Sequence, residues 1–162
     1  MSHLFLVKMR LFILLLFGSI IHYNILAQYV NNPDLLLISS DIEQPLINEG
    51  NPMPGKAVLQ YLPEYVGSKL AHVVYLPRNW NNRKRYPVIV EYLGNSTFVK
   101  DLKGIAYAIT KGNDFIWIVL PFVSLDHSHD VNWWWGDVEA TVSYAKKAIP
   151  LVCNQWGGAA QW

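Results

Sequence analysis

Two dense apolar stretches in the middle of the chain predict buried β-strands. Residues 85–95 are rich in β-branched side chains and end at Gly94-Asn95, which is typical of a strand followed by a tight turn. Residues 115–121 form a second such run, with a helix-compatible stretch between the two. This order predicts two parallel strands joined by a crossover. Because ligands bind beyond the carboxyl ends of such strands, we expect the turn at residues 93–95 to carry chemistry.

Weaker strand signals precede the first run. Residues 58–62 predict an edge strand, and residues 70–76 predict a second strand in which we expect His72 to be a structural histidine with its hydrogen bonds satisfied. A polar connection of about seven residues, 79–85, leads to the next strand, and so short a loop favours antiparallel neighbours. We therefore predict an α/β fold with a mixed sheet, antiparallel in its first strands and then parallel, with flanking helices.

Apolar residues at helical spacing predict two helices, at residues 101–111 and 137–149. Pro150 is expected to kink or end the second helix, and Cys153, in an apolar context beyond it, is expected to be buried. The residues expected on one face of each helix are Leu102, Ile105, Ala106 and Ile109 in the first and Val138, Val142, Ala145 and Ile149 in the second.

Residues 1–27 have the pattern of a secretory signal peptide. Lys8 and Arg10 form a basic start, residues 11–21 form an apolar core, and Ala27 ends a small-residue cleavage site. We predict a secreted or extracytoplasmic protein that meets the membrane only through this segment; an uncleaved anchor is the alternative. Residues 28–57, rich in Asn, Pro and Gly, predict an extended leader to a domain at 58–162.

The charge balance gives no electrostatic basis for binding nucleic acid. Without the predicted signal segment, 11 basic residues remain against 12 acidic ones, a net charge of about −1. The basic run at residues 83–85, with Arg78 nearby, lies between two strand signals, and we interpret it as a solvated loop rather than a binding patch.

The loop predicted at residues 124–136 carries two further candidate sites. Its His-rich stretch, residues 126–130, could place two imidazoles and flanking carboxylates around a metal, although polar loops of this composition are usually solvated. No Cys/His spacing in the chain matches a zinc site. The run Trp133-Trp134-Trp135 offers a stacking surface for a ligand, or else packs between the loop and the following helix.

The order of these motifs resembles the N-terminal half of a secreted α/β-hydrolase, in its esterase and polyester-depolymerase-like branch. Over about residues 70–158 the resemblance is carried by VVYLPRNW followed by YPVIVEYLGN, then DFIWIVLPF, WWWGDVEATVSYAKKAIP and WGG. It implies hydrolysis of a small-molecule or polymeric carboxylic ester by a serine nucleophile, without a cofactor. It also implies that Gly94 and Asn95 form part of an oxyanion hole, with the Asn95 N–H as donor.

The sequence departs from that family at two places. Leu93-Gly94 stands where family members often have His-Gly, and a plain strand-ending turn is the alternative for Gly94 and Asn95. The chain also contains no Gly-x-Ser-x-Gly motif and ends four residues after Gly158, so we expect a partial domain without nucleophile, acid or base that is inactive alone. A sheet edge left open in such a fragment predicts self-association.

The competing hypothesis is a non-catalytic secreted binding module that uses Trp133, Trp134 and Trp135 to bind carbohydrate or protein. Asn95-Ser96-Thr97 is also an N-glycosylation sequence, and a glycan on Asn95 would block the expected oxyanion turn. Use of this sequence would therefore weaken the hydrolase interpretation.

We expect export to remove residues 1–27, because the basic start and the short apolar core fit a cleaved signal better than a membrane span. N-terminal sequencing of the secreted protein should begin at Gln28. A soluble cytoplasmic pool that retains Met1 would contradict this prediction.

Overall fold

The computed structural model describes residues 42–94, 97–102, 106–133 and 136–159, all within the compact unit Ile42–Trp162. The predicted signal segment and the start of the predicted leader lie outside the described residues. From residue 42 onwards the leader contributes β1 (Ile47–Asn48) and the first residue of β2 (Ala57–Gln60). No helix in the described part of the chain has the length and hydropathy needed to cross a membrane.

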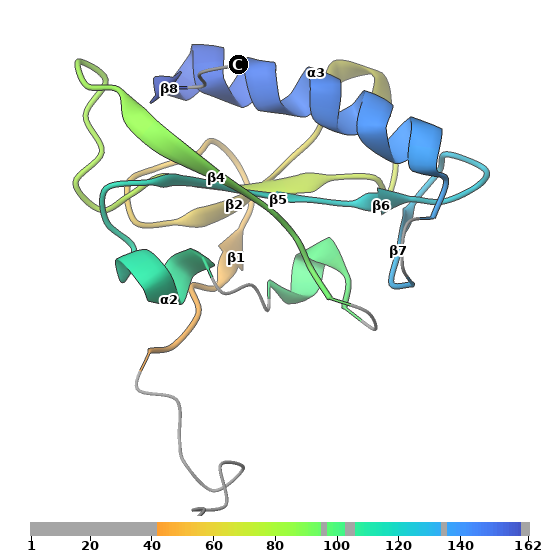
Figure 1. The fold of residues 1–162 in the computed structure, drawn as a ribbon, viewed down its shortest axis with the longest axis horizontal. Helices are drawn as coiled ribbons and strands as arrows, with labels where there is room; N and C mark the ends of the chain where they lie inside the picture. The colour runs from red at the N-terminus through yellow and green to blue at the C-terminus, as the bar shows by residue number, and fades with distance from the viewer. Residues whose placement is uncertain (1–41, 95–96, 103–105, 134–135, 160–162) are drawn as a thin grey trace, which may run out of the picture. The chain divides into compact units, whose positions relative to one another are not determined.

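A six-stranded mixed sheet forms the centre of this unit (Figure 1). Its strands lie in the spatial order β1, β2, β3 (His72–Tyr75), β5 (Ile116–Leu120), β4 (Tyr86–Tyr92) and β8 (Gly158–Ala159). β3 pairs antiparallel with β2 and β5, whereas β4 pairs parallel with β5 and β8, and β1 runs parallel to β2. The predicted α/β class with a mixed sheet is confirmed.

The predicted pairing between the strands on either side of residues 79–85 is wrong. β3 and β4 follow one another in the chain, but β5 lies between them and pairs with both. All five residues of β5 are buried, so a central position removes its two faces and its two edges from water. The short connection therefore crosses the end of β5 instead of forming a hairpin.

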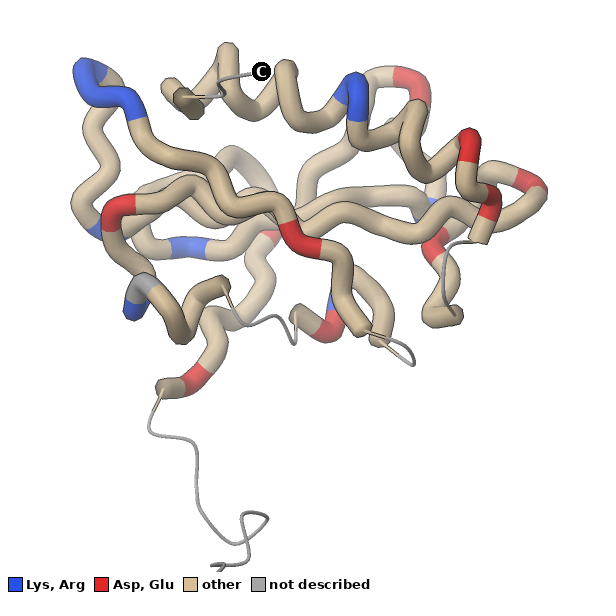
Figure 2. The backbone as a smooth tube through the Cα atoms, viewed as in Figure 1, with Lys and Arg blue, Asp and Glu red and all other residues tan. Residues whose placement is uncertain are grey.

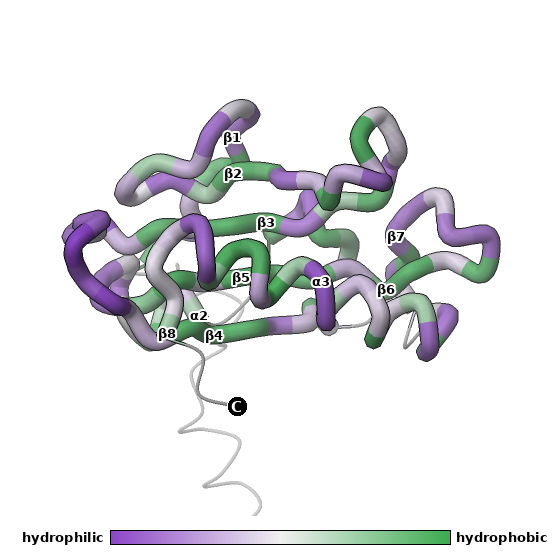
Figure 3. Tube along the Cα trace, turned by 90° about the horizontal axis from the view of Figure 1, so that it is seen from above, coloured by the Kyte–Doolittle hydropathy of each residue, from purple (hydrophilic) through white to green (hydrophobic). Residues whose placement is uncertain are grey.

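Helices cover both faces of the sheet, and neighbouring side chains of each central strand enter opposite layers. α3 (Val138–Trp156) packs on one face, with Val74 of β3 and Ile118 of β5. η2 (Val99–Asp101) and α2 (Ala106–Thr110) pack on the other, with Val73 and Trp117. Figure 3, which looks onto the α3 side, shows the strands side by side and their hydrophobic residues concentrated at the centre. A 3₁₀ turn, η1 (Pro63–Tyr65), leads from β2 towards β3.

The predicted inward face of α3 is right for Ala145 and Ile149, which are partly buried against the core, and wrong for Val138 and Val142. Val138 and Val142 are 54% and 46% exposed, and the helix buries Thr141 and Tyr144 instead. Both polar side chains have partners: Thr141 Oγ1 accepts a hydrogen bond from the Val123 N–H, and Tyr144 Oη lies 2.9 Å from His72 Nδ1. Satisfied hydrogen bonds thus allow polar groups to take the buried face. The helix continues through Pro150 to Trp156.

The helix predicted at residues 101–111 is observed as η2 and α2. Leu102 adopts a left-handed conformation, with φ 44°, which ends η2 and changes the phase of the following residues. Leu102 and Ala106 are buried as predicted, whereas Ile109 is 70% exposed and Tyr107 is buried in its place. Ile105 lies outside the described residues.

His72 is hydrogen-bonded in the core, as expected of a structural histidine, and the burial predicted for Cys153 is confirmed. His72 is 1% exposed, and its burial lowers the pKa of the imidazole to about 4. Cys153 lies on the inner side of α3, and burial raises the pKa of its thiol. The contact between His72 and Tyr144 links β3 to α3 across the core.

We expect His72 to make the fold sensitive to mild acid. The folded-state pKa of about 4 lies below the ordinary value of 6.5, so its contribution to stability is fully present above pH 6.5 and is lost as the pH falls towards 4. The free energy of unfolding, measured with urea, should fall by on the order of 3 kcal/mol over this interval. Substituting His72→Gln should flatten the dependence, because Gln can still bond Tyr144 but does not titrate. An unchanged slope in that variant would contradict the assignment.

We also expect the outer edge of β4 to promote self-association. Among the described residues, β8 pairs with β4 at Tyr86 and Pro87 only, and farther along the strand Val90 is 37% exposed. Apolar strand edges associate, and a lysine on such an edge opposes this. In sedimentation velocity, Val90→Lys should therefore reduce oligomers more than Leu125→Lys, a control at a loop residue that is 79% exposed. A wild-type chain that is monodisperse, monomeric and cooperatively folded would show the expectation to be wrong.

Candidate functional site

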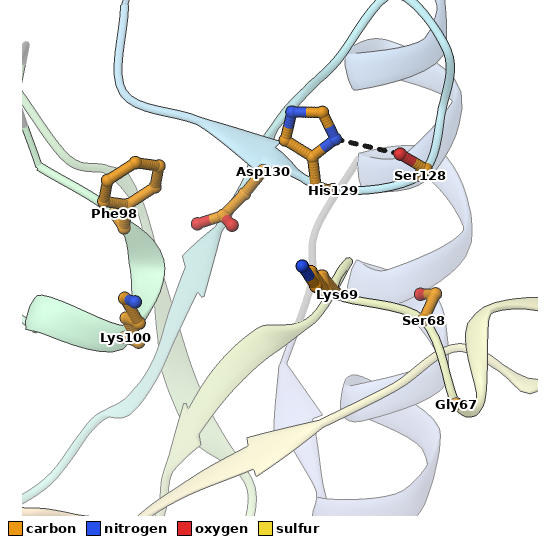
Figure 4. Close-up of a pocket in the computed structure, with 8 residues that line it drawn as sticks. All are labelled: Gly67, Ser68, Lys69, Phe98, Lys100, Ser128, His129 and Asp130. Atoms are coloured by element: carbon orange, nitrogen blue, oxygen red, sulfur yellow. Dashed lines mark hydrogen bonds between the residues drawn. The ribbon is translucent and has the colours of Figure 1, made fainter.

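A cavity of about 660 Å³ opens beyond the carboxyl ends of β4 and β5. Residues 98–100 follow β4, residues 128–130 follow β5, and residues 67–69 precede β3, which runs antiparallel to β5. The sequence predicts a functional site at this end of the strands. The lining residues, shown in Figure 4, are Gly67, Ser68, Lys69, Phe98, Lys100, Ser128, His129 and Asp130.

Hydrogen bonds tie the three walls of this cavity to one another. The Asp130 carboxylate accepts a hydrogen bond from the Val99 N–H at 3.1 Å, which joins the wall at residues 128–130 to η2. A backbone bridge pairs Lys69 with His129. Asp130 also belongs to β7 (Asp130–Val131), which pairs antiparallel with β6 (Phe122–Val123). The cavity is therefore formed by segments that are far apart in the sequence and fixed in place by the fold.

The loop between β6 and β7 is organised by the buried hydroxyl of Ser124. Its Oγ donates to Asp126 at 2.6 Å and accepts hydrogen bonds from the backbone N–H groups of Ser128 and His129. The hydrogen bond from Ser124, with a further one from Ser128, lowers the pKa of Asp126 to about 2. The short polar spacing Ser-x-Asp-x-Ser thus builds a local turn.

The His-rich stretch lies in solvent. The side chains of His127 and His129 are 53% and 43% exposed, as expected of a solvated loop. His127 Nε2 lies 2.9 Å from Asp137 Oδ2, at the start of α3. Among the residues that the structure describes, no group of three or more His, Cys, Asp or Glu side chains is placed to hold a metal ion.

Sequence reasoning missed a contact between a serine and a histidine on this loop. Ser128 Oγ lies 2.9 Å from His129 Nδ1, and Asp126 Oδ1 lies 3.4 Å from the same nitrogen. In a catalytic triad the serine uses Nε2 and the carboxylate uses Nδ1, so that the ring can accept the proton while it is held in place. Here both groups compete for one nitrogen, so the geometry does not activate Ser128.

The structure places Gly94 just beyond the carboxyl end of β4, at the same end of the sheet as the cavity. Its φ lies outside the left-handed region, and an added Cβ would meet nothing within 4 Å, so the described residues show no steric need for glycine. Leu93 is buried against η2 and α2. Asn95, the expected oxyanion donor, lies outside the described residues.

The structure describes only the first residue of the tryptophan run. Trp133 is 57% exposed, and Trp134 and Trp135 lie outside the described residues. Gly136, with φ 55°, passes so close to Val123 that an added Cβ would lie 2.1 Å from the carbonyl oxygen. This close passage brings Asp137 into position to cap α3, where its side chain accepts from the Ala140 N–H.

The basic residues 83–85 precede β4 at its amino end (Figure 2), whereas the cavity lies beyond its carboxyl end. All three are exposed, and they line a separate depression of about 310 Å³ beside the carboxyl end of α3. Arg85 donates to the carbonyl of Gly158 in β8 at 3.4 Å. These contacts support the interpretation of a solvated loop with a structural role.

The cavity combines groups suited to binding rather than to nucleophilic attack. Two ammonium groups and two hydroxyls surround it, and Lys100 Nζ lies 5.5 Å from the centroid of the Phe98 ring. Among the described residues, no serine in its lining has a base in catalytic geometry. No protein-family model, curated protein or solved structure matches the chain.

Proposed function

We propose that the chain is the N-terminal part of a secreted α/β-hydrolase-type serine esterase, which acts on small-molecule or polymeric carboxylic esters. One observation carries the proposal: α3 leads through Gly157-Gly158 directly into β8, a parallel strand on the outer side of β4. In the family that the sequence resembles, the corresponding strand leads to the turn that bears the nucleophile.

The glycine pair at this junction has a steric basis. Gly157 caps α3 in the left-handed region, with φ 77°, and its N–H donates to the Cys153 carbonyl. A Cβ on Gly158 would lie 2.7 Å from Cys153 Sγ and 2.8 Å from Val88 Cγ2. Only a residue without a side chain lets the strand leave the helix so close to β4.

The register then sets the direction of the chain. Tyr86 pairs with Gly158 and Pro87 pairs with Ala159. β8 therefore runs in the direction of β4, towards the end of the sheet at which Gly94 lies. Acyl transfer needs a nucleophile and oxyanion donors within about 3 Å of one carbonyl group. A strand that continues from β8 would end beside the turn after β4, which supports a shared site there.

A non-catalytic binding module is the second candidate function. It is favoured by the exposure of Trp133, since a tryptophan side chain in water offers a face for stacking on carbohydrate or protein. Retention of the chain on an insoluble polysaccharide, abolished by Trp133→Ala, would favour this alternative.

Reading the transcript beyond codon 162 separates the two functions. The esterase proposal requires a strand followed by a Gly-x-Ser-x-Gly motif, and the absence of that motif in every nearby frame would contradict the proposal.

We expect the isolated chain to be inactive as an esterase. An oxyanion turn supplies neither an attacking group nor proton transfer, and the chain has no nucleophile motif. Assays with short-chain nitrophenyl esters should show no turnover above a buffer control, and a serine-reactive fluorophosphonate should not label the chain. Stoichiometric labelling of any serine, with Ser128→Ala as the control for the His129 contact, would show that the chemistry lies elsewhere.

A further inference from the structure

We propose that the cavity lined by residues 67–69, 98–100 and 128–130 binds a small aromatic carboxylate. Its volume of about 660 Å³ falls within the range of small-molecule sites. Figure 4 shows Lys69, Lys100 and Asp130, from three separate segments, around the central space. The inference does not depend on the proposed esterase function, because it uses only groups that the structure describes.

The charges around the cavity favour an anion. Two lysines and one aspartate line it, and these three residues together carry a net charge of +1. Among the described residues, neither Lys69 nor Lys100 has a carboxylate within ion-pair distance, in contrast to Lys147, whose Nζ lies 2.7 Å from Glu64. The Asp130 carboxylate instead accepts from the Val99 N–H. The two ammonium groups are therefore available to an incoming acid.

The other lining groups specify which anion. Phe98 is half-buried and presents an apolar ring beside Lys100, which suits an aromatic body with its acid directed at the ammonium groups. Asp130 adds a negative charge to the same space and so disfavours a dianion such as phosphate. A monoanion on a flat apolar body fits both groups.

The site is largely pre-organised, which lowers the entropic cost of binding. Ser68 Oγ donates to the Tyr65 carbonyl at 2.7 Å and accepts from the Leu70 N–H at 3.0 Å, so the segment that carries Lys69 is fixed. Asp101 accepts from the Phe98 N–H at 3.0 Å, which fixes the segment that carries Lys100. The side chains of Lys69 and Lys100 are therefore the main groups that lose conformational freedom when a ligand binds.

Calorimetric titration of the purified full chain with benzoate at low ionic strength tests the proposal. We expect saturable one-to-one binding that weakens about tenfold in Lys69→Gln and in Lys100→Gln, because each loses a charge-assisted hydrogen bond. Lys146→Gln, at an exposed position on α3, should bind as the wild type does. Lys69→Arg should retain binding, since it keeps the charge, and thermal melts confirm that each variant is folded.

Neutral benzamide and inorganic phosphate are the comparison ligands. Benzamide should bind at least about tenfold more weakly than benzoate, since it lacks the charge. Non-saturating heats with benzoate, or binding that neither lysine variant changes, would overturn the site. Phosphate that binds as tightly as benzoate would overturn the assignment of an aromatic ligand, because phosphate makes no use of Phe98.

Discussion

The burial of β5 on both faces is the constraint on which the rest of the structure depends. Ile116, Ile118 and Leu120 point into the layer under α3, and Trp117 and Val119 point into the layer under η2 and α2. Each such side chain contributes about 1.5–3 kcal/mol when it is removed from water. That gain is available only if β3 and β4 flank the strand and helices cover both faces, and the Trp117 indole N–H must also find a partner, which Glu91 provides at 2.9 Å.

The cavity follows from the way this central strand ends. Pro121 has no N–H to donate, so β5 stops there and the chain enters the β6–β7 hairpin. Thr141 accepts from the Val123 N–H and ties that hairpin to α3, and Asp130 ties it to η2. The positions of the cavity walls are thus set by polar contacts that begin where the apolar core ends.

Sequence patterns predict where the strands lie in the chain but not which strands lie side by side in the sheet. Runs of β-branched residues mark β4 and β5 because propensity and burial are local properties. The place of β5 between β3 and β4 depends on competition for the centre of the sheet, which no single run contains. Sequence patterns do not predict the burial of Thr141 and Tyr144 on α3, because these polar side chains become buried only through partners on other elements. The cavity lysines, Lys69 and Lys100, belong to no motif and meet only through the topology, while Asn95, Trp134 and Trp135 lie outside the described residues.

The described fold leaves apolar surface in two places, and the esterase proposal would cover both with further elements. Val90 and Tyr92 of β4 are each 37% exposed, and Val138 and Val142 of α3 are more exposed still. Parallel strands are normally paired and covered on both faces. A strand continuing from β8 would cover the outer edge of β4, and a helix after that strand could cover the flank of α3. The cavity differs, because its walls come from residues 67–130 and are fixed by their own hydrogen bonds. The binding proposed for the cavity therefore needs none of the groups that acyl transfer requires.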